Sequence, residues 1–249
     1  MLRRLVAVPR DSFHLGLMLA LTFSTGVIDA VGYLGLDRVF TGNMTGNVVI
    51  LGMGLVGADD LPVLGPLLAL AGFMLGAALG GRVLKAAGPG WTRRTTVLFG
   101  LVALVMLAVA ALLFVIEDDL SRPVGITITT VLGAAMGVQA ATARFIAVKD
   151  VTTVVVTSTI TGLAADSVLG SGKGTGDTSR RVAAVLLILA GAAAGAALLN
   201  WHLGAGLVLA GAAAGAALLK WHLGAGLVLA GAITLTVTAL GTLHAQHQR

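Results

Sequence analysis

The chain contains no cysteine and very few charged or aromatic residues. The absence of cysteine excludes disulfide bonds, thiolate-bound metals and a cysteine nucleophile. Charged residues make up only 11% of the 249 residues, whereas a soluble domain carries about 25%. With so few charges, a chain folded in water could not cover its surface with polar groups. The composition therefore excludes a soluble globular protein.

Long apolar runs take the place of the missing charges, and 57% of the residues are hydrophobic. A membrane-spanning helix needs roughly 20 apolar residues, and several runs reach that length. We therefore expect an all-α fold, a polytopic transmembrane helical bundle that forms one transmembrane domain over residues 1–249. The apolar segments are 12–36, 39–57, 61–84, 95–116, 124–148, 151–170, 182–199, 203–219 and 223–243.

The formal net charge of +5 does not indicate a nucleic-acid-binding protein. The basic residues stand at the ends of apolar segments, where lysine and arginine act as topology signals. We therefore expect the lipid bilayer and a small solute as partners, and no nucleic acid.

Two of the apolar segments, 39–57 and 151–170, are partly polar and follow their predecessors after only two charged residues. Either both segments span the membrane, or both enter and leave it on the same side. If both span, the basic loop 85–94 lies outside, against the positive-inside rule. If both re-enter, this loop and the N-terminus are cytoplasmic, and the acidic residues 117–119 are external. The distribution of lysine and arginine favours re-entry.

Re-entry divides the chain into two inverted copies of one plan, 12–116 and 124–243. Each copy has three spans and one re-entrant or broken helix. The two polar segments share the pattern T-x-x-x-T-G, at 41–46 and 157–162, in matching places of the two halves. Inverted repeats with broken helices are typical of secondary transporters.

Residues 190–209 recur as 210–229, and the two copies differ only at Asn200 and Lys220. So close a copy is recent, engineered or a sequence error. It is as long as one span, so the side of the membrane on which the C-terminus lies depends on it.

Glycine pairs in the pattern GxxxG allow two helices to approach closely. They could form the faces of a homodimer, or they could pack helices together within one chain, which is the interpretation we favour. The pairs are Gly76/Gly80, Gly191/Gly195 and Gly211/Gly215.

Polar residues within apolar segments are the candidates for a functional site. Asp29 lies in the first span, where a carboxylate is costly and indicates function; alternatively it pairs with Arg38 near the outer end. Arg144 could bind an anion, pair with Asp166 or extend to the interface.

The two threonine-rich segments could form one bipartite site, because non-helical backbone at membrane depth is tolerated where it lines a cavity. Alternatively, they only pack two bent helices. The substrate-binding candidates are Asp29, Thr41, Asn43, Thr45, Asn47, Gln139, Arg144, Thr157, Thr159, Thr161 and Asp166.

The sequence carries no convincing enzyme signature. The glycine-rich stretch 170–176 lacks the spacing of a phosphate-binding loop, and neither G-x-S-x-G nor H-E-x-x-H occurs. We expect no enzymatic activity, no cofactor and no metal site.

The stretches 24–33 and 38–47, the second of which contains TGNMTGN, resemble the YoaK-like family of bacterial membrane proteins. The residues Gly137–Gln139, 150–154 and 161–162 are similar to that family as well. The resemblance covers nearly the whole chain except the duplicated 20 residues. It implies a multi-pass protein of the bacterial inner membrane and supplies no substrate.

The leading hypothesis from the sequence is a small secondary transporter or channel for a small solute. Two helix N-termini and a basic mouth favour an anion, and Asp29 is a candidate for proton coupling. The alternatives are a non-transporting membrane scaffold or assembly partner and, last, an intramembrane enzyme.

Overall fold

The computed structural model describes residues 10–88, 90–116, 120–146, 156–172 and 178–199. All regular secondary structure in these ranges is helical. The elements are α2 (Arg10–Gly35), α3 (Met44–Leu55), the 3-10 helix η1 (Ala58–Asp60), α4 (Leu64–Leu84), α5 (Arg93–Ile116), α6 (Arg122–Ile146), α7 (Val156–Ala165) and α8 (Thr178–Leu199). The expected segments 203–219 and 223–243, and with them the second copy of the duplication, lie outside the described residues.

The helices follow the predicted apolar segments closely, and the two polar segments form the shortest of the α-helices described. α3 has 12 residues and α7 has 10. At 1.5 Å per residue these helices are about 18 Å and 15 Å long, well short of a hydrocarbon layer of about 30 Å. Neither could cross a bilayer as a helix alone.

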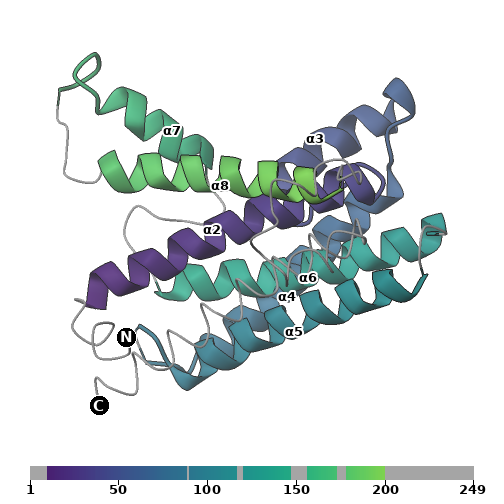
Figure 1. Ribbon diagram of the computed structural model, residues 1–249, viewed down its shortest axis with the longest axis horizontal. Helices are drawn as coiled ribbons and strands as arrows, with labels where there is room; N and C mark the ends of the chain where they lie inside the picture. The colour runs from purple at the N-terminus through teal and green to yellow at the C-terminus, as the bar shows by residue number, and fades with distance from the viewer. Residues whose placement is uncertain (1–9, 89, 117–119, 147–155, 173–177, 200–249) are drawn as a thin grey trace, which may run out of the picture.

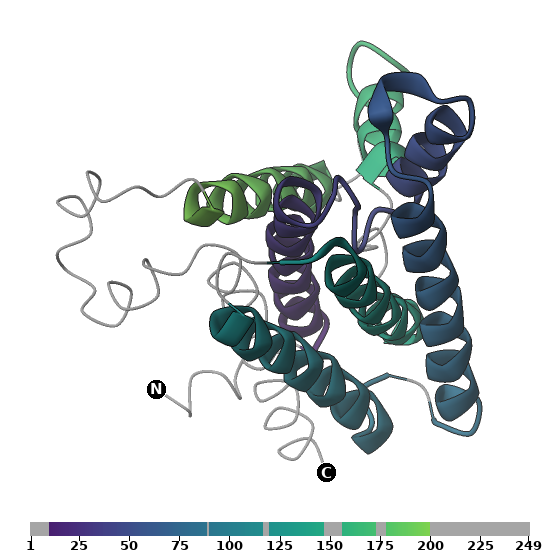
Figure 2. The ribbon, with the colours of Figure 1, turned by 90° about the vertical axis from the view of Figure 1, so that its right-hand side faces the viewer.

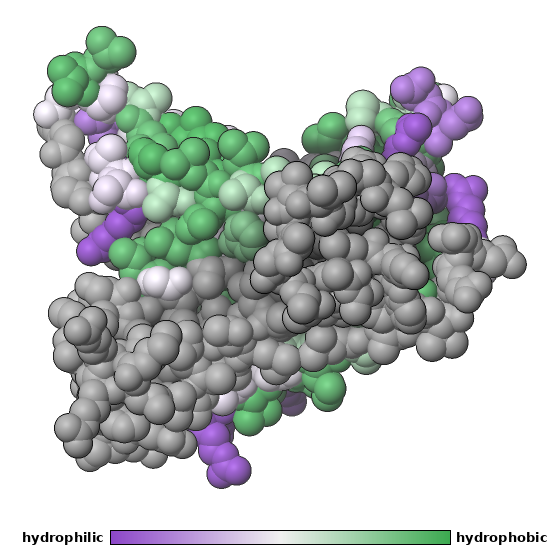
Figure 3. Space-filling view, viewed as in Figure 1, coloured by the Kyte–Doolittle hydropathy of each residue, from purple (hydrophilic) through white to green (hydrophobic). Residues whose placement is uncertain are grey.

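Four of the described helices, α4, α5, α6 and α8, are long and apolar enough to cross a membrane. Large apolar side chains on these helices point outward instead of into the bundle. Met74, Leu75 and Leu79 on α4 are each more than 60% exposed. Figure 3 shows hydrophobic surface over α8 with hydrophilic residues toward the ends of the molecule. Such a surface is suited to lipid, and the protein is an integral membrane protein.

The long helices form a bundle in which α4 packs most extensively against α6, and α2 against α8. α2 and α8 run in one direction, and α4 and α6 run in the other (Figure 1). α6 lies between α2 and α4 when the bundle is viewed along its length (Figure 2). We call the end where α2 stops and where α4 and α6 begin the Arg122 end.

Glycines bring the helices of each pair into backbone contact. A Cβ atom on Gly76 of α4 would clash with the carbonyl oxygen of Ala134 on α6, and a Cβ on Gly191 of α8 would clash with that of Phe23 on α2. These glycines therefore pack helices of the same chain together. This is the interpretation of the GxxxG pairs that we favoured over the faces of a homodimer. The same holds for Gly80 and Gly195, while Gly211 and Gly215 lie outside the described residues.

Candidate functional site

Asp29 lies on α2 about two turns before its end and is only 8% exposed. Its Oδ1 accepts hydrogen bonds from three successive backbone N–H groups, at 3.0 Å from Thr41, 2.7 Å from Gly42 and 3.3 Å from Asn43. The carboxylate thus holds the chain segment that leads into α3. The sequence-based alternative of a pair with Arg38 is therefore wrong for Oδ1, because its partners are backbone amides.

Asn47 holds the same segment from the side of α3. It is fully buried, and its amide forms two hydrogen bonds with the backbone of Phe40. Nδ2 donates to the Phe40 carbonyl at 2.7 Å, and Oδ1 accepts from the Phe40 N–H at 2.8 Å. Asn47 therefore satisfies both backbone groups of a residue that no helix includes.

Glycines let the segment 39–43 lie directly on its neighbours. A Cβ on Gly32 of α2 would lie 2.6 Å from the carbonyl oxygen of Val39, and a Cβ on Gly46 of α3 would meet the ring of Phe40 at 2.6 Å. The ring of Phe40 also stacks on Tyr33 at 4.8 Å between ring centroids. The segment 39–43 is therefore a closely packed turn, and Gly32 and Gly46 admit its backbone and the ring of Phe40.

Asn43 is the N-cap of α3, and its Oδ1 accepts from the N–H of Gly46 at 3.2 Å. Asparagine is among the best N-cap residues. The helix consequently begins at Met44, within the polar first half of the segment 39–57. Asn43 and Thr45 are exposed, whereas Thr41 is buried.

Gln139 extends this polar region across to α6. Its side chain is 1% exposed, and its Nε2 donates to the hydroxyl of Thr25, one turn before Asp29 on α2, at 3.5 Å. Its Oε1 is buried and has no hydrogen-bond partner among the described residues. Gly42 lies close to the same place, because a Cβ there would be 3.1 Å from Thr25 and 3.1 Å from Met136 of α6.

We call Thr25, Asp29, Thr41, Gly42 and Gln139 the buried polar cluster. It joins α2, the segment before α3 and α6. Sequence reasoning selected three of its side chains and missed Thr25, because a threonine in an apolar helix commonly bonds only to its own backbone.

The second threonine-rich segment forms the start of α7. Thr157 and Thr161 are exposed and Thr159 is partly exposed, and the Thr161 hydroxyl donates to the Thr157 carbonyl at 2.9 Å. α3 and α7 begin toward the middle of the bundle and run outward to opposite ends (Figure 1). α3 packs on α4, and α7 packs on α8.

Asp166, just after α7, pairs with Arg181 of α8. The Nη1–Oδ2 distance is 2.7 Å, and the Arg181 side chain is only 17% exposed. A Cβ on Gly162 would lie 2.7 Å from Nη1 of Arg181, so this glycine leaves room for the guanidinium. The partner of Asp166 is therefore Arg181 and not Arg144, which is exposed in the last turn of α6.

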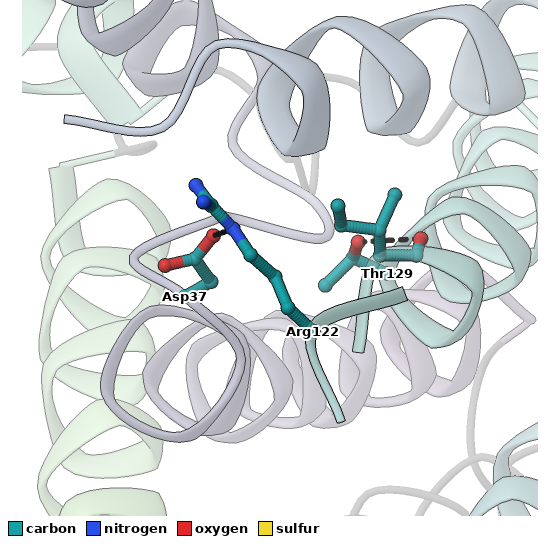
Figure 4. Close-up of polar contacts among 4 residues, drawn as sticks. Asp37, Arg122 and Thr129 are labelled. Atoms are coloured by element: carbon teal, nitrogen blue, oxygen red, sulfur yellow. Dashed lines mark hydrogen bonds and ion pairs between the residues drawn. The ribbon is translucent and has the colours of Figure 1, made fainter. Parts of the chain in front are cut away.

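A different polar contact lies at the Arg122 end. The Nε of Arg122 lies 3.3 Å from Oδ2 of Asp37, and both side chains are well exposed (Figure 4). Nearby, Leu61, Val63, Leu64, Arg122, Pro123 and Ile126 line an open groove of about 540 Å³. An exposed ion pair contributes only about 0–1 kcal/mol, so this pair is a minor contact between the residues just after α2 and the start of α6.

We expect Asn47→Ala to destabilise the protein by about 2–4 kcal/mol. The substitution leaves the N–H and the carbonyl of Phe40 without partners, and each unsatisfied buried polar group costs about 1–3 kcal/mol. The matched control is Asn43→Ala, which removes only an exposed cap worth about 1 kcal/mol. Thermal unfolding of the purified variants in detergent would measure both effects. Equal losses for the two variants would contradict the assigned role of Asn47.

The comparison with known families supports the assignment to a membrane-protein family. A family described as "Protein of unknown function (DUF1275)" matches residues 17–210. The chain belongs to the DUF1275 family.

The DUF1275 match includes the TGNMTGN element, the buried polar cluster and all helices from α3 to α8. The chain is also 32% identical over 151 residues to the UPF0700 transmembrane protein YoaK of Bacillus subtilis (strain 168). That alignment covers 60% of this chain and 65% of the relative. The resemblance to the YoaK-like family is thereby confirmed. No solved structure matches the chain.

Proposed function

We propose that this DUF1275 protein is a small secondary transporter or channel of the bacterial inner membrane, built from two inverted repeats. The first repeat contributes α2, α3, α4 and α5, and the second begins with α6, α7 and α8. α3 and α7 are the re-entrant segments of the two repeats.

The observation that carries this proposal is the equivalence of two helix contacts. Gly80 of α4 lies against Val138 and Ala141 of α6, and Gly195 of α8 lies against Val27 and Ala30 of α2. Both contacts therefore join a glycine to a valine and to an alanine three residues further on.

The equivalence continues one turn earlier on all four helices. Gly76 of α4 lies against Ala134 of α6, and Gly191 of α8 lies against Phe23 of α2. In both pairs the contact moves four residues back on each helix. Glycines on the partner helices make equivalent contacts as well. Gly137 of α6 lies against Phe73 and Ala77 of α4. In the same way, Gly26 of α2 lies against Ile188 and Ala192 of α8.

A two-fold axis in the membrane plane would exchange α2 with α6 and α4 with α8. It would also exchange α3 with α7, which agrees with α3 packing on α4 and α7 on α8. Repeats of this kind hold their substrate near the middle of the membrane, between broken helices, and move against each other during transport. The buried polar cluster lies at the start of one such helix, where α2 of the first repeat meets α6 of the second.

Cysteine accessibility in whole cells tests the topology, and a chain without native cysteine makes the labelling clean. Ala58→Cys and Ser121→Cys should label from one side of the membrane with an impermeant thiol reagent, and Ala87→Cys and Ser171→Cys only from the other. We expect the first pair to be external and the N-terminus cytoplasmic. Gln248→Cys reports separately on the tail. External labelling at Ala87→Cys, with Ala58→Cys protected from the external reagent, would mean that 39–57 spans, and the inverted repeat would be lost.

Flux through liposomes tests transport itself. We expect the reconstituted protein to move a small solute, and we expect the double variant Gly80→Leu/Gly195→Leu, which wedges both helix pairs apart, to abolish the flux. Gly81→Leu is the matched control, because nothing lies within 4 Å of a Cβ at Gly81. Absence of flux for a panel of cations, anions and neutral solutes would contradict the proposal.

The second candidate is a non-transporting membrane scaffold. It is favoured by Asp29 and Asn47, whose hydrogen bonds hold the chain's own backbone. It predicts that Asp29→Asn changes stability or partner binding and that no variant of the cluster changes flux.

A further inference from the structure

We propose that the buried polar cluster binds a small monovalent cation, through the Oε1 of Gln139 and the carboxylate of Asp29. This inference rests on the proposed transport function for its purpose, since the cation would be the solute or the coupling ion. Its physical basis is the set of hydrogen-bonding groups that the cluster contains.

The orientation of the Gln139 amide is fixed by Thr25. The Thr25 hydroxyl donates its hydrogen to the carbonyl of Leu21 at 2.9 Å. The hydroxyl oxygen can then only accept, so the Gln139 amide must direct its NH₂ group toward it. The carbonyl oxygen Oε1 is left as a buried acceptor without a donor.

A buried acceptor without a partner is rare in folded proteins and calls for an explanation, such as an ion. The unfavourable desolvation of Oε1 would be offset by a bound cation or by a hydrogen-bond donor carried on one. Gln139 therefore supplies an oxygen ligand that no other group in the described chain uses.

The charge in the cluster has the sign that a cation requires. Among the described residues, Asp29 is the only charged side chain that is buried. The Arg181 side chain, at 17% exposure, is paired with Asp166 beside α7. The carboxylate of Asp29 and the amide oxygen of Gln139 are oxygen ligands of the kind that hard cations prefer.

The same geometry argues against an anion at this place, although the sequence favoured one. That expectation relied on two helix N-termini and a basic mouth, and the first of these N-termini is the start of α3. The N–H groups of Thr41, Gly42 and Asn43 already donate to Asp29, and that of Gly46 donates to Asn43. An anion would meet a carboxylate there and find these donors occupied.

Cation-dependent stability of the purified full chain in detergent tests the inference. Thermal unfolding is followed in N-methylglucamine chloride, and sodium chloride or ammonium chloride replaces it at constant ionic strength. We expect one of these cations to raise Tm saturably by roughly 5 °C or more, as for a ligand at about a hundredfold its Kd that binds only the folded state. Replacing chloride by nitrate or sulfate at constant N-methylglucamine should leave Tm unchanged.

Gln139→Leu separates binding from folding. Without the cation we expect its Tm to equal or exceed that of the wild type, because an apolar group replaces an acceptor that had no partner. We expect its cation affinity to fall at least about tenfold. A tenfold change corresponds to about 1.4 kcal/mol, and a contact between a polar group and a charge contributes more than that. The control on the same helix is Thr142→Val, whose hydroxyl donates only to the carbonyl of Val138 at 2.7 Å; its cation response should be that of the wild type.

The inference is overturned if no cation raises Tm, if the anion exchange produces the shift, or if Gln139→Leu responds like the wild type. Flux in liposomes tells its failure apart from that of the proposed function. Cation binding without any flux leaves the site and removes the transporter, whereas anion flux without cation binding leaves the transporter and removes the site.

Discussion

Asp29→Ala should lower the free energy of unfolding by about 3 kcal/mol or more, the largest effect of any single substitution in the cluster. Three backbone N–H groups, those of Thr41, Gly42 and Asn43, lose their common acceptor. Each buried donor without a partner costs about 1–3 kcal/mol, and hydrogen bonds to a charged acceptor are stronger than neutral ones. Water that enters the vacated space would recover part of the loss.

Two further variants show whether the acceptor or the charge matters. Asp29→Asn keeps one oxygen that can accept from the segment before α3, so it should lose less stability than Asp29→Ala. Asp37→Ala removes an aspartate just beyond the same helix, and its exposed pair with Arg122 should contribute no more than about 1 kcal/mol. Thermal unfolding in detergent would rank the three, and a loss for Asp37→Ala equal to that for Asp29→Ala would contradict the assigned role.

Gly76→Ala should also destabilise the protein. Its new methyl group would clash with the carbonyl of Ala134 on the adjacent helix. Overpacking typically costs about 1–3 kcal/mol. Here it would force α4 away from α6, and these two helices form the most extensive contact between described helices. Gly191→Ala should cost a similar amount, because the contact between α8 and α2 is equivalent.

The matched control for this prediction is Gly81→Ala. The site lies on the same helix as Gly76, and nothing is within 4 Å of a Cβ there. We expect no loss and a gain of up to about 1 kcal/mol, since alanine is the better helix former. Unfolding in detergent would measure all three variants. If Gly76→Ala is as stable as Gly81→Ala, the close contact between α4 and α6 does not exist in the membrane protein.

The helices could be predicted well from the sequence because lipid makes composition decisive. A chain with 57% hydrophobic and 11% charged residues has to place its apolar runs in a bilayer, where backbone groups are satisfied within helices. The predicted segment 61–84 corresponds to α4, Leu64–Leu84, and the predicted segment 95–116 corresponds to α5, Arg93–Ile116. The unusual character of 39–57 and 151–170 was also evident from their polar residues.

The roles of the candidate residues depended on contacts between distant parts of the chain. Asp29 and Gly42 are 13 residues apart, and Gln139 lies 114 residues from Thr25. A composition argument locates an unusual carboxylate, but it does not say which backbone groups are close enough to donate to it. Asp166 shows the same limit, since charge and proximity suggested Arg144 whereas packing of α7 on α8 brought Arg181 to 2.7 Å.

The sequence by itself determined that this protein is an all-helical membrane protein, where most of its helices lie and which two segments interrupt the pattern. These properties follow from local hydropathy and local charge. Only the tertiary structure decided that Gly76 and Gly191 serve packing within the chain, that Asp29 holds the start of α3, and that Gln139 has an oxygen without a partner. Those properties arise because helices from both halves of the chain meet in one core, and contacts of that range are not encoded in any single segment.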